Sequence, residues 1–337
     1  MKRQAWLDYM KFIAMFLVVV YHTPPRYDNA HESALFNIGT PVFFFAAGYV
    51  FNIAKQKNFF SFLKHRARQI LVPYTTFFII FYALWLLVGR RMAGPEEMAI
   101  DKLTPLWQFI KGQPDIVVGP FWFLACLFFM QVVYYPIKRL LPGYWPLVVA
   151  FIISLIGLMD AFPDIRFWNI GRAMLYLPVY AVGNCCHKQI EHFRFDTLPR
   201  TLLWLGLAAI ALCFLIIAPL RIDRDLAYVL APEAVIMMLP AITATCRLLE
   251  DRFGASRVAQ NVAMTGITYL GFQNYLIGII KMLVAKFAGP EVFDDNIILK
   301  VFIALLVMAI LYPLALIVER YFPFLLGKPY KKLKTVN

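Results

Sequence analysis

Apolar stretches of membrane-spanning length recur along the whole chain. A transmembrane helix needs about 20 predominantly apolar residues, and ten stretches approach that length, near residues 6–22, 35–54, 70–89, 119–137, 146–163, 172–187, 201–220, 226–246, 267–287 and 297–319. The fifth and sixth are the weakest, because they are short or interrupted by Pro163 and Pro178. The pattern predicts an all-α polytopic membrane protein, with about ten transmembrane helices in one bundle and a single membrane-embedded domain over residues 1–337.

Composition agrees with a membrane protein rather than a soluble one. Hydrophobic residues make up 61% of the 337 residues, and the mean hydropathy is +0.66, whereas soluble domains carry more charge. The five cysteines lie in or beside apolar stretches, their number is odd, and their spacing fits no metal site. We expect them to pack as small apolar residues, with no disulfide framework and no bound metal.

Basic residues are distributed unevenly between the two sides of the membrane. If the N-terminus is inside, the inner segments hold 20 Lys and Arg residues and the outer loops hold 9. Because cytosolic loops are enriched in these residues, the imbalance predicts cytosolic N- and C-termini. The net charge of +13 then reflects topology, and it does not indicate nucleic acid as a partner.

The first apolar stretch carries three ionisable residues on one helical face. At 100° per residue, Asp8, Lys11 and His22 fall within about 60° of one another. Such residues are costly in lipid, so we expect this face to contact the protein interior or a wet cavity and to mark a functional path. Lys11 and His22 are about 16 Å apart along a straight helix, so they would serve different parts of one tunnel.

Other polar residues stand at the ends of predicted helices. Arg66 and Arg68 lie shortly before Pro73, where two guanidiniums could grip a phosphate; alternatively they anchor the cytosolic face among lipid headgroups. Trp122 lies near the start of the fourth stretch and Glu319 ends the last one. Both positions also suit residues that only mark the membrane boundary.

Five short motifs, in this order along the chain, resemble those of the acyltransferase-3 family. They are Asp8-x-x-Lys11 followed by His22, residues 41–50, Arg66-Ala67-Arg68 with Pro73, residues 119–124, and residues 318–323. The resemblance therefore covers nearly the whole chain. Some positions depart from the family pattern: Lys11 replaces the usual Arg, Ala47 replaces a common Ser, and Gln273 and Asn274 lie near where many relatives carry a His.

The resemblance implies an integral-membrane O-acyltransferase of the bacterial-type inner (plasma) membrane. Such an enzyme takes an acyl group, most often acetyl, from cytosolic acyl-CoA. It delivers this group to a hydroxyl of a saccharide or lipid-linked glycan on the outer face. The expected partners are therefore acetyl-CoA as co-substrate, a glycan acceptor and the lipid bilayer, with no metal. The oligomeric state stays open.

His22 is the expected general base. An alcohol is a poor nucleophile at neutral pH, so a base must take its proton as it attacks the thioester. His22 lies at the predicted outer end of the first helix, and the ordinary pKa of histidine, about 6.5, suits this task. The alternative is a histidine that only caps the helix at the interface.

The donor is expected to bind at the cytosolic side. Lys11, Arg66 and Arg68 would hold the nucleotide-side phosphates of CoA, while the pantetheine arm carries the thioester towards His22. Asp8 either pairs with Lys11 or is simply favoured near a helix N-terminus. Glu319 either supports Arg66 and Arg68 through an ion pair, together with Arg320, or marks the membrane boundary.

The oxyanion donor and the acceptor site are left open by the sequence. Asn274, Gln273 and Trp122 are candidate donors, although an interhelical polar clamp or an interfacial aromatic role suits them equally. The acceptor would meet one of two outer loops: residues 23–34, which carry Arg26, Tyr27, Asp28, Asn29, His31 and Glu32, or residues 90–118, which carry Trp107.

Two other function classes also fit a polytopic membrane protein. A transporter or flippase of a polar solute or lipid-linked saccharide would share the buried charge, but no paired halves with matching broken helices are evident. A non-catalytic scaffold or receptor would not explain the aligned face of the first helix. Stabilisation by acyl-CoA would distinguish the enzyme from both.

Overall fold

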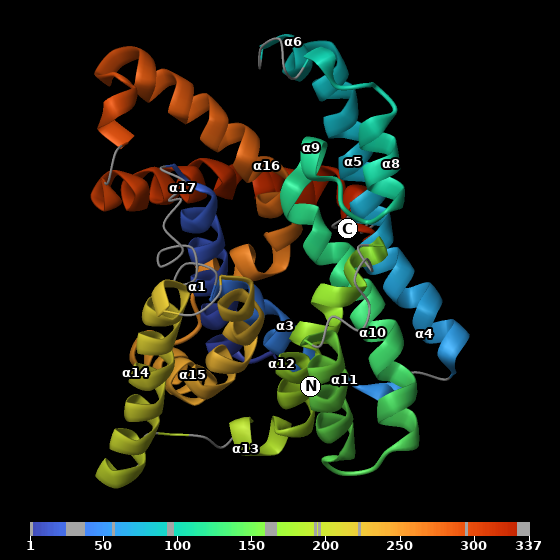
Figure 1. Cartoon of the computed structure of the whole chain (residues 1–337), viewed down its shortest axis with the longest axis vertical. Coiled ribbons are helices and arrows are strands. Elements are labelled where there is room, and N and C mark those ends of the chain that lie inside the picture. The colour runs from blue at the N-terminus through green and yellow to red at the C-terminus, as the bar shows by residue number, and fades with distance from the viewer. Residues whose placement is uncertain are drawn as a thin grey trace, which may run out of the picture.

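The computed structural model describes residues 3–24, 38–55, 58–92, 98–158, 167–191, 194, 197–221, 224–293 and 296–328. Every regular element in these ranges is a helix (Figure 1). The prediction of an all-α protein is therefore confirmed. The longer helices are α1 (Ala5–His22), α3 (Gly39–Tyr49), α5 (Val72–Leu84), α10 (Trp122–Leu140), α11 (Trp145–Leu158), α12 (Ile170–Cys185), α14 (Leu198–Arg221), α15 (Arg224–Phe253), α16 (Arg257–Ala288) and α17 (Ile297–Tyr321).

Shorter elements connect these helices. They are η1 (Ile53–Lys55), α4 (Phe59–Arg66), η2 (Ala67–Leu71), η3 (Trp85–Gly89), α6 (Arg90–Met92), α8 (Thr104–Ile110), α9 (Asp115–Val118), η4 (Gly119–Phe121), η5 (Phe167–Asn169), α13 (His187–Glu191), η6 (Pro290–Phe293) and η7 (Pro323–Leu326).

Seven helical stretches in the described residues are long and apolar enough to cross a membrane. They are Ala5–His22, Phe59–Gly89, Asp115–Leu140, Leu198–Ala218, Leu230–Phe253, Arg257–Ala288 and Ile297–Tyr321. The second, fifth and sixth predicted spans contain helices α3, α11 and α12, which have only 11, 14 and 16 described residues. A multi-pass membrane protein is thus supported, and the count of ten spans stays a prediction.

The predicted cytosolic loop before the third span is mostly helical. Helix α4 continues through the π-helical turn η2 into α5, which gives one helical stretch from Phe59 to Gly89. Pro73 has no amide hydrogen to donate to the carbonyl of Gln69, and a π-helical turn is a common way to accommodate such a break. Arg66 and Arg68 therefore lie on a helix rather than in a flexible loop.

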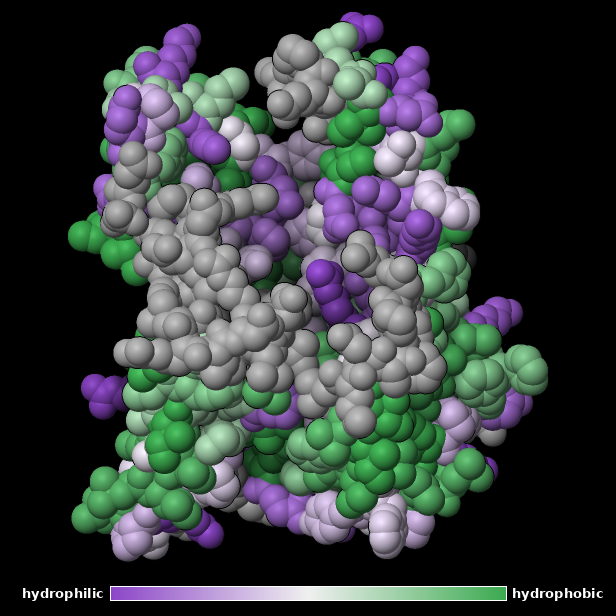
Figure 2. Space-filling view, in the orientation of Figure 1, coloured by the Kyte–Doolittle hydropathy of each residue, from purple (hydrophilic) through white to green (hydrophobic). Residues whose placement is uncertain are grey.

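The outer flanks of α11 and α14 are apolar. Figure 2 shows hydrophobic residues over both helices, in the lower part of the view. The exposed side chains on α11 include Val148, Phe151, Ile152 and Leu155, and those on α14 include Leu202, Leu203, Ile210 and Ile217. Because apolar surface of this extent is favoured in lipid and not in water, these helices lie at the periphery of the bundle.

Helices α3 and α12 cross in direct backbone contact. A Cβ atom added to Gly48 would lie 2.0 Å from the carbonyl oxygen of Tyr180, and one added to Gly183 would lie 2.3 Å from that of Phe45. Glycine at both positions is what allows the two backbones to approach, as in many membrane helix pairs. The contact lies near the C-terminal ends of both helices, and α3 in turn packs against α1.

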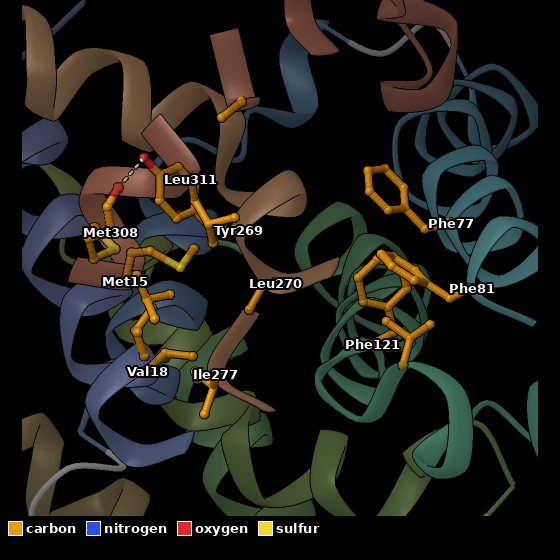
Figure 3. Close-up of a cluster of buried hydrophobic side chains, with 14 of the residues drawn as sticks. Met15, Val18, Phe77, Phe81, Phe121, Tyr269, Leu270, Ile277, Met308 and Leu311 are labelled. Atoms are coloured by element: carbon orange, nitrogen blue, oxygen red, sulfur yellow. Dashed lines mark hydrogen bonds between the residues drawn. The ribbon is translucent and has the colours of Figure 1, made fainter. Parts of the chain in front are cut away.

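The ionisable face of α1 packs against α16 and α17. Met15 lies on the same face as Asp8 and His22, and it is buried beside Tyr269 and Met308 (Figure 3). Tyr269 donates a hydrogen bond of 3.5 Å to the carbonyl of Met308. The expectation that this face meets the protein interior is confirmed for its middle part.

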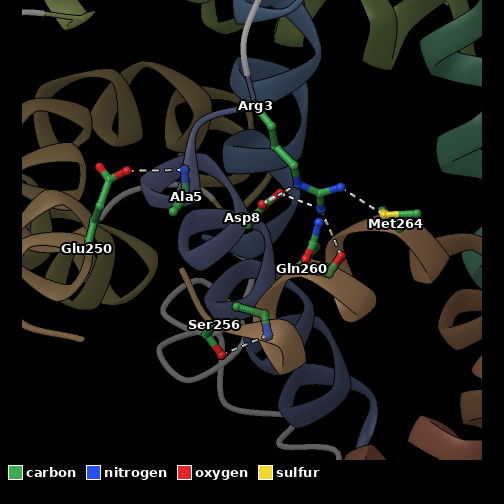
Figure 4. Close-up of polar contacts among 8 residues, drawn as sticks. Arg3, Ala5, Asp8, Glu250, Ser256, Gln260 and Met264 are labelled. Carbon is green, nitrogen blue, oxygen red and sulfur yellow. Dashed lines mark hydrogen bonds and ion pairs between the residues drawn. The ribbon is translucent and has the colours of Figure 1, made fainter. Parts of the chain in front are cut away.

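The start of α1 is held where α15 meets α16. Arg3 donates hydrogen bonds of 3.1 Å to the carbonyl of Gln260 and 2.8 Å to the sulfur of Met264 (Figure 4). The Ala5 amide donates a hydrogen bond of 3.2 Å to the Glu250 carboxylate. The Lys328 ammonium also donates 3.4 Å to the carbonyl of Met264. Three segments that the charge pattern predicts to be cytosolic thus meet in one place.

Candidate active site

His22 is the last residue of α1, and its side chain lines a small cavity between several helix ends. The cavity volume is about 100 Å³, enough for a few water molecules or a group the size of an acetyl. The lining residues come from α1, α3, η4, α10, α12 and α16: Val18, Tyr21, His22, Thr40, Phe43, Pro120, Trp122, Phe123, Arg172 and Leu270. A basic side chain, an indole and a guanidinium therefore share one cavity wall.

Trp122 reaches the cavity because of the turn that precedes it. The 3₁₀ turn η4 contains Pro120, whose fixed φ suits the start of a helix. Trp122 then opens α10, and its ring lies 4.4 Å from the Arg172 guanidinium carbon. This distance is a cation–π contact.

Arg172 stands in the first turn of α12, and the backbone before it is unusual. Trp168 and Asn169 both have φ of 53°, a left-handed conformation that costs energy for residues other than glycine. The Trp168 amide donates 2.6 Å to the carbonyl of Lys111, and the Asn169 side chain donates 2.6 Å to that of Gly112. These contacts hold the N-terminal end of α12 against residues 111–112 and so constrain the backbone from which Arg172 projects.

The other two oxyanion candidates lie on α16 and do not line this cavity. A Cβ atom at Gly119 would lie 3.6 Å from the Asn274 amide nitrogen, so Asn274 packs beside the entry to α10. Gln273 is fully buried, and neither amide atom has a hydrogen-bond partner in the described residues. Of the three predicted candidates, Trp122 is the one that lines the cavity with His22.

Asp8 and Lys11 lie near the opposite end of α1 from His22. Asp8 forms an ion pair of 2.7 Å with Arg3, shown in Figure 4. The direct partner of Asp8 is thus Arg3, while Lys11 acts on the carboxylate only through longer-range attraction. Within the described part of the chain, the Lys11 ammonium forms no hydrogen bond or ion pair of its own.

Arg66 and Arg68 differ in their surroundings although they are two residues apart. Arg66 donates 3.0 Å to the Gln69 side chain, and its guanidinium lies 5.8 Å from the Phe62 ring. The Arg68 side chain is exposed. Both stand at one end of the 59–89 helical stretch, where an exposed guanidinium can reach a soluble phosphate.

Within the described residues, Glu319 pairs with Lys328, and no ion pair joins it to Arg66 or Arg68, which was one of the two roles that the sequence left open. It accepts 2.8 Å from the Lys328 ammonium, and the neighbouring Arg320 guanidinium lies over the Tyr321 ring at 5.4 Å. The chain beyond α17 nevertheless reaches the Arg68 region through its backbone. A Cβ atom at Gly327 would lie 2.0 Å from the Arg68 carbonyl oxygen.

Of the two loops predicted to meet the acceptor, the structure describes most of residues 90–118 but little of residues 23–34. Arg26, Tyr27, Asp28, Asn29, His31 and Glu32 lie outside the described residues. Trp107, in α8, is exposed, and the Lys111 ammonium lies 5.3 Å from the centre of its ring. An exposed indole beside a cation suits a sugar-binding surface, and that role stays a prediction.

Comparison with known families decides the class of this site. A family model described as an acyltransferase domain, Acyl_transf_3, matches residues 4–320, nearly the whole chain. The chain belongs to the acyltransferase-3 family. Membership implies a membrane acyltransferase, and the matched region includes every residue that lines the cavity. No curated protein and no solved structure matches the chain.

Arg172 is the site residue that sequence reasoning missed. In the sequence it is one basic residue among many near the start of an apolar stretch, and no spacing relates it to His22. The left-handed residues just before it leave no clear trace in composition either. Its place in the site follows only from the packing of α12 beside α10 and α1.

Proposed function

We propose that the protein is an O-acetyltransferase of the bacterial-type inner membrane. It moves an acetyl group from cytosolic acetyl-CoA to a hydroxyl of a saccharide or lipid-linked glycan on the outer face. The observation that carries the proposal is the cavity shared by His22, Trp122 and Arg172 in a chain of the acyltransferase-3 family. A base and hydrogen-bond donors in one small cavity are what acyl transfer to an alcohol requires.

His22 performs the proton transfers in this proposal. The acceptor oxygen attacks the thioester carbonyl carbon while His22 takes the hydroxyl proton. The carbon–sulfur bond then breaks, and the histidinium returns the proton to the leaving thiolate, which gives free CoA and the acetyl ester. Trp122 forms part of the wall against which the acceptor or the acyl group lies.

Acetyl-CoA enters from the opposite side. Lys11, Arg66 and Arg68 supply cations for its phosphates, and the residues around Arg3, Met264 and Lys328 form the surrounding surface. Their clustering supports cytosolic N- and C-termini, because three separately predicted inner segments come together. Met15 and its buried neighbours lie between this end of α1 and His22, so the extended pantetheine arm must displace side chains as it enters.

The test is acetyl transfer by purified protein in nanodiscs. Radiolabelled acetyl-CoA and a glycolipid extract of a bacterial envelope serve as substrates. His22→Ala should lower transfer about 100-fold or more, while acetyl-CoA should still raise the melting temperature of this variant. His65→Ala is the matched control, because His65 is an exposed histidine on α4 and should leave transfer unchanged. Full transfer by a folded His22→Ala protein would contradict the mechanism.

A further inference from the structure

We propose that Arg172 is the donor that stabilises the oxyanion of acyl transfer. The inference rests on the proposed function and adds a catalytic residue to it. As the acceptor oxygen bonds to the thioester carbon, the carbonyl electron pair moves onto oxygen, and the guanidinium hydrogen-bonds to that oxygen. When the carbon–sulfur bond breaks, the carbonyl re-forms and the thiolate takes the proton held by His22.

The position of the guanidinium supports this role. It lies over the Trp122 ring at 4.4 Å, and the Arg172 side chain lines the same cavity as His22. Stacking on an aromatic face leaves the edge of a guanidinium, which carries the N–H donors, available for an oxygen. Within the described part of the chain, no protein acceptor is hydrogen-bonded to those donors.

The charge around Arg172 favours a developing anion as its partner. Asp115 carries a negative charge within electrostatic range of Arg172, and the two side chains do not form an ion pair. The buried Cys126 thiol also lies within electrostatic range of this cation. A half-buried cation without a close carboxylate is costly in apolar surroundings, and a negative charge that forms beside it offsets that cost.

Acyl transfer itself produces a negative charge, on the former carbonyl oxygen, for every acceptor. A neutral sugar has no anionic group for Arg172 to bind, whereas every acyl transfer from a thioester passes through a negative oxygen. The backbone before Arg172 is fixed by the contacts of Trp168 and Asn169 with the 111–112 turn. A donor held in place before the reaction costs little reorganisation when the charge forms.

The deciding experiment separates turnover from binding in Arg172→Met. Methionine keeps an apolar stem on Trp122 and removes the charge and the donors. We expect kcat to fall about 100-fold to 1,000-fold, with KM for acetyl-CoA and for the glycolipid acceptor within about threefold of wild type. Arg139→Met removes an exposed arginine from the end of α10 and should leave both constants unchanged.

Other results would overturn the inference in recognisable ways. A large rise in acceptor KM with unchanged kcat would instead assign Arg172 to an anionic group of the acceptor. If Arg172→Met does not fold, Arg172→Gln keeps a neutral donor, and its kcat should fall at least about tenfold; a kcat within twofold of wild type would refute the role. Failure of wild-type transfer, or an active His22→Ala, would refute the proposed function itself.

Discussion

At the residue scale, the two ends of α1 carry different chemistry. His22 lies in the cavity with Trp122 and Arg172 at the C-terminal end of α1, while Asp8 pairs with Arg3 near the start of the helix. Because Asp8 has its own partner, Lys11 is not neutralised by a direct ion pair within the described residues. Lys11, which lies close to Arg3, therefore stays a candidate for the phosphates of the proposed acyl donor.

Arg66 and Arg68 should contribute to donor binding and not to turnover. A charged hydrogen bond contributes about 1.5–3 kcal/mol, so Arg68→Ala should raise KM for acetyl-CoA about tenfold or more at nearly constant kcat. Arg66→Ala should also lower the melting temperature, because its side chain contacts Gln69 and Phe62. Steady-state kinetics with Arg139→Ala as control checks this, and lost turnover at unchanged KM would remove both residues from the donor site.

At the element scale, the site depends on how closely α3 and α12 approach. Thr40 and Phe43 of α3 and Arg172 of α12 all line the cavity, and the crossing at Gly48 and Gly183 sets the distance between these helices. Since the backbones are already in contact there, no side chain can be inserted without moving one helix. A shift of this kind would widen the cavity as well as weaken the packing.

Gly48→Ala should therefore destabilise the protein and reduce transfer together. Overpacking of a tight contact costs about 1–3 kcal/mol or more, and a Cβ at Gly48 would lie 2.0 Å from the Tyr180 carbonyl oxygen. Gly206→Ala is the matched control, because Gly206 is in helix α14 with nothing within 4 Å of its Cβ position. That control should be neutral or stabilising by up to about 1 kcal/mol. Equal melting temperatures for the two variants would contradict the tight crossing.

At the scale of the whole molecule, the C-terminal segment joins distant parts of the face that the charge pattern predicts to be cytosolic. Lys328 pairs with Glu319 and donates to the carbonyl of Met264, and Thr76 donates 3.0 Å to the carbonyl of Leu325. The segment thus packs along the helical stretch that carries Arg66 and Arg68. It contacts the backbone at Arg68, whereas Glu319 pairs with Lys328.

Gly327→Ala should disturb donor binding from outside the membrane-spanning part. Gly327 has φ of 63°, and its Cβ would lie 2.0 Å from the Arg68 carbonyl oxygen, so alanine should push η7 away from η2 and raise KM for acetyl-CoA. Gly254→Ala is the control: its φ of 67° imposes a similar backbone cost, but no atom lies within 4 Å of the added Cβ. Comparing KM for acetyl-CoA in the two variants isolates the effect of the contact between Gly327 and Arg68. Equal KM values would show that the C-terminal segment does not position Arg68.

The sequence alone determined the family of the protein and its all-helical class. Hydropathy is a local property, so long apolar stretches such as those that form α1, α10 and α17 are visible without any fold. The family motifs are also local, which is why His22, Arg66 and Arg68 could be named in advance. Even here, the stretch from Phe59 to Gly89 was underestimated, because a polar helical extension resembles a loop in hydropathy.

Only the tertiary structure decided which residues meet. Arg172, Trp122 and His22 are far apart in the sequence and share a cavity because three helix ends converge. The ion-pair partners of Asp8 and Glu319 are likewise Arg3 and Lys328, two residues that the sequence had not singled out for this role. Side-chain pairing depends on helix rotation, close crossings and turns with unusual φ. These arise from packing between distant segments, which no single stretch of sequence encodes.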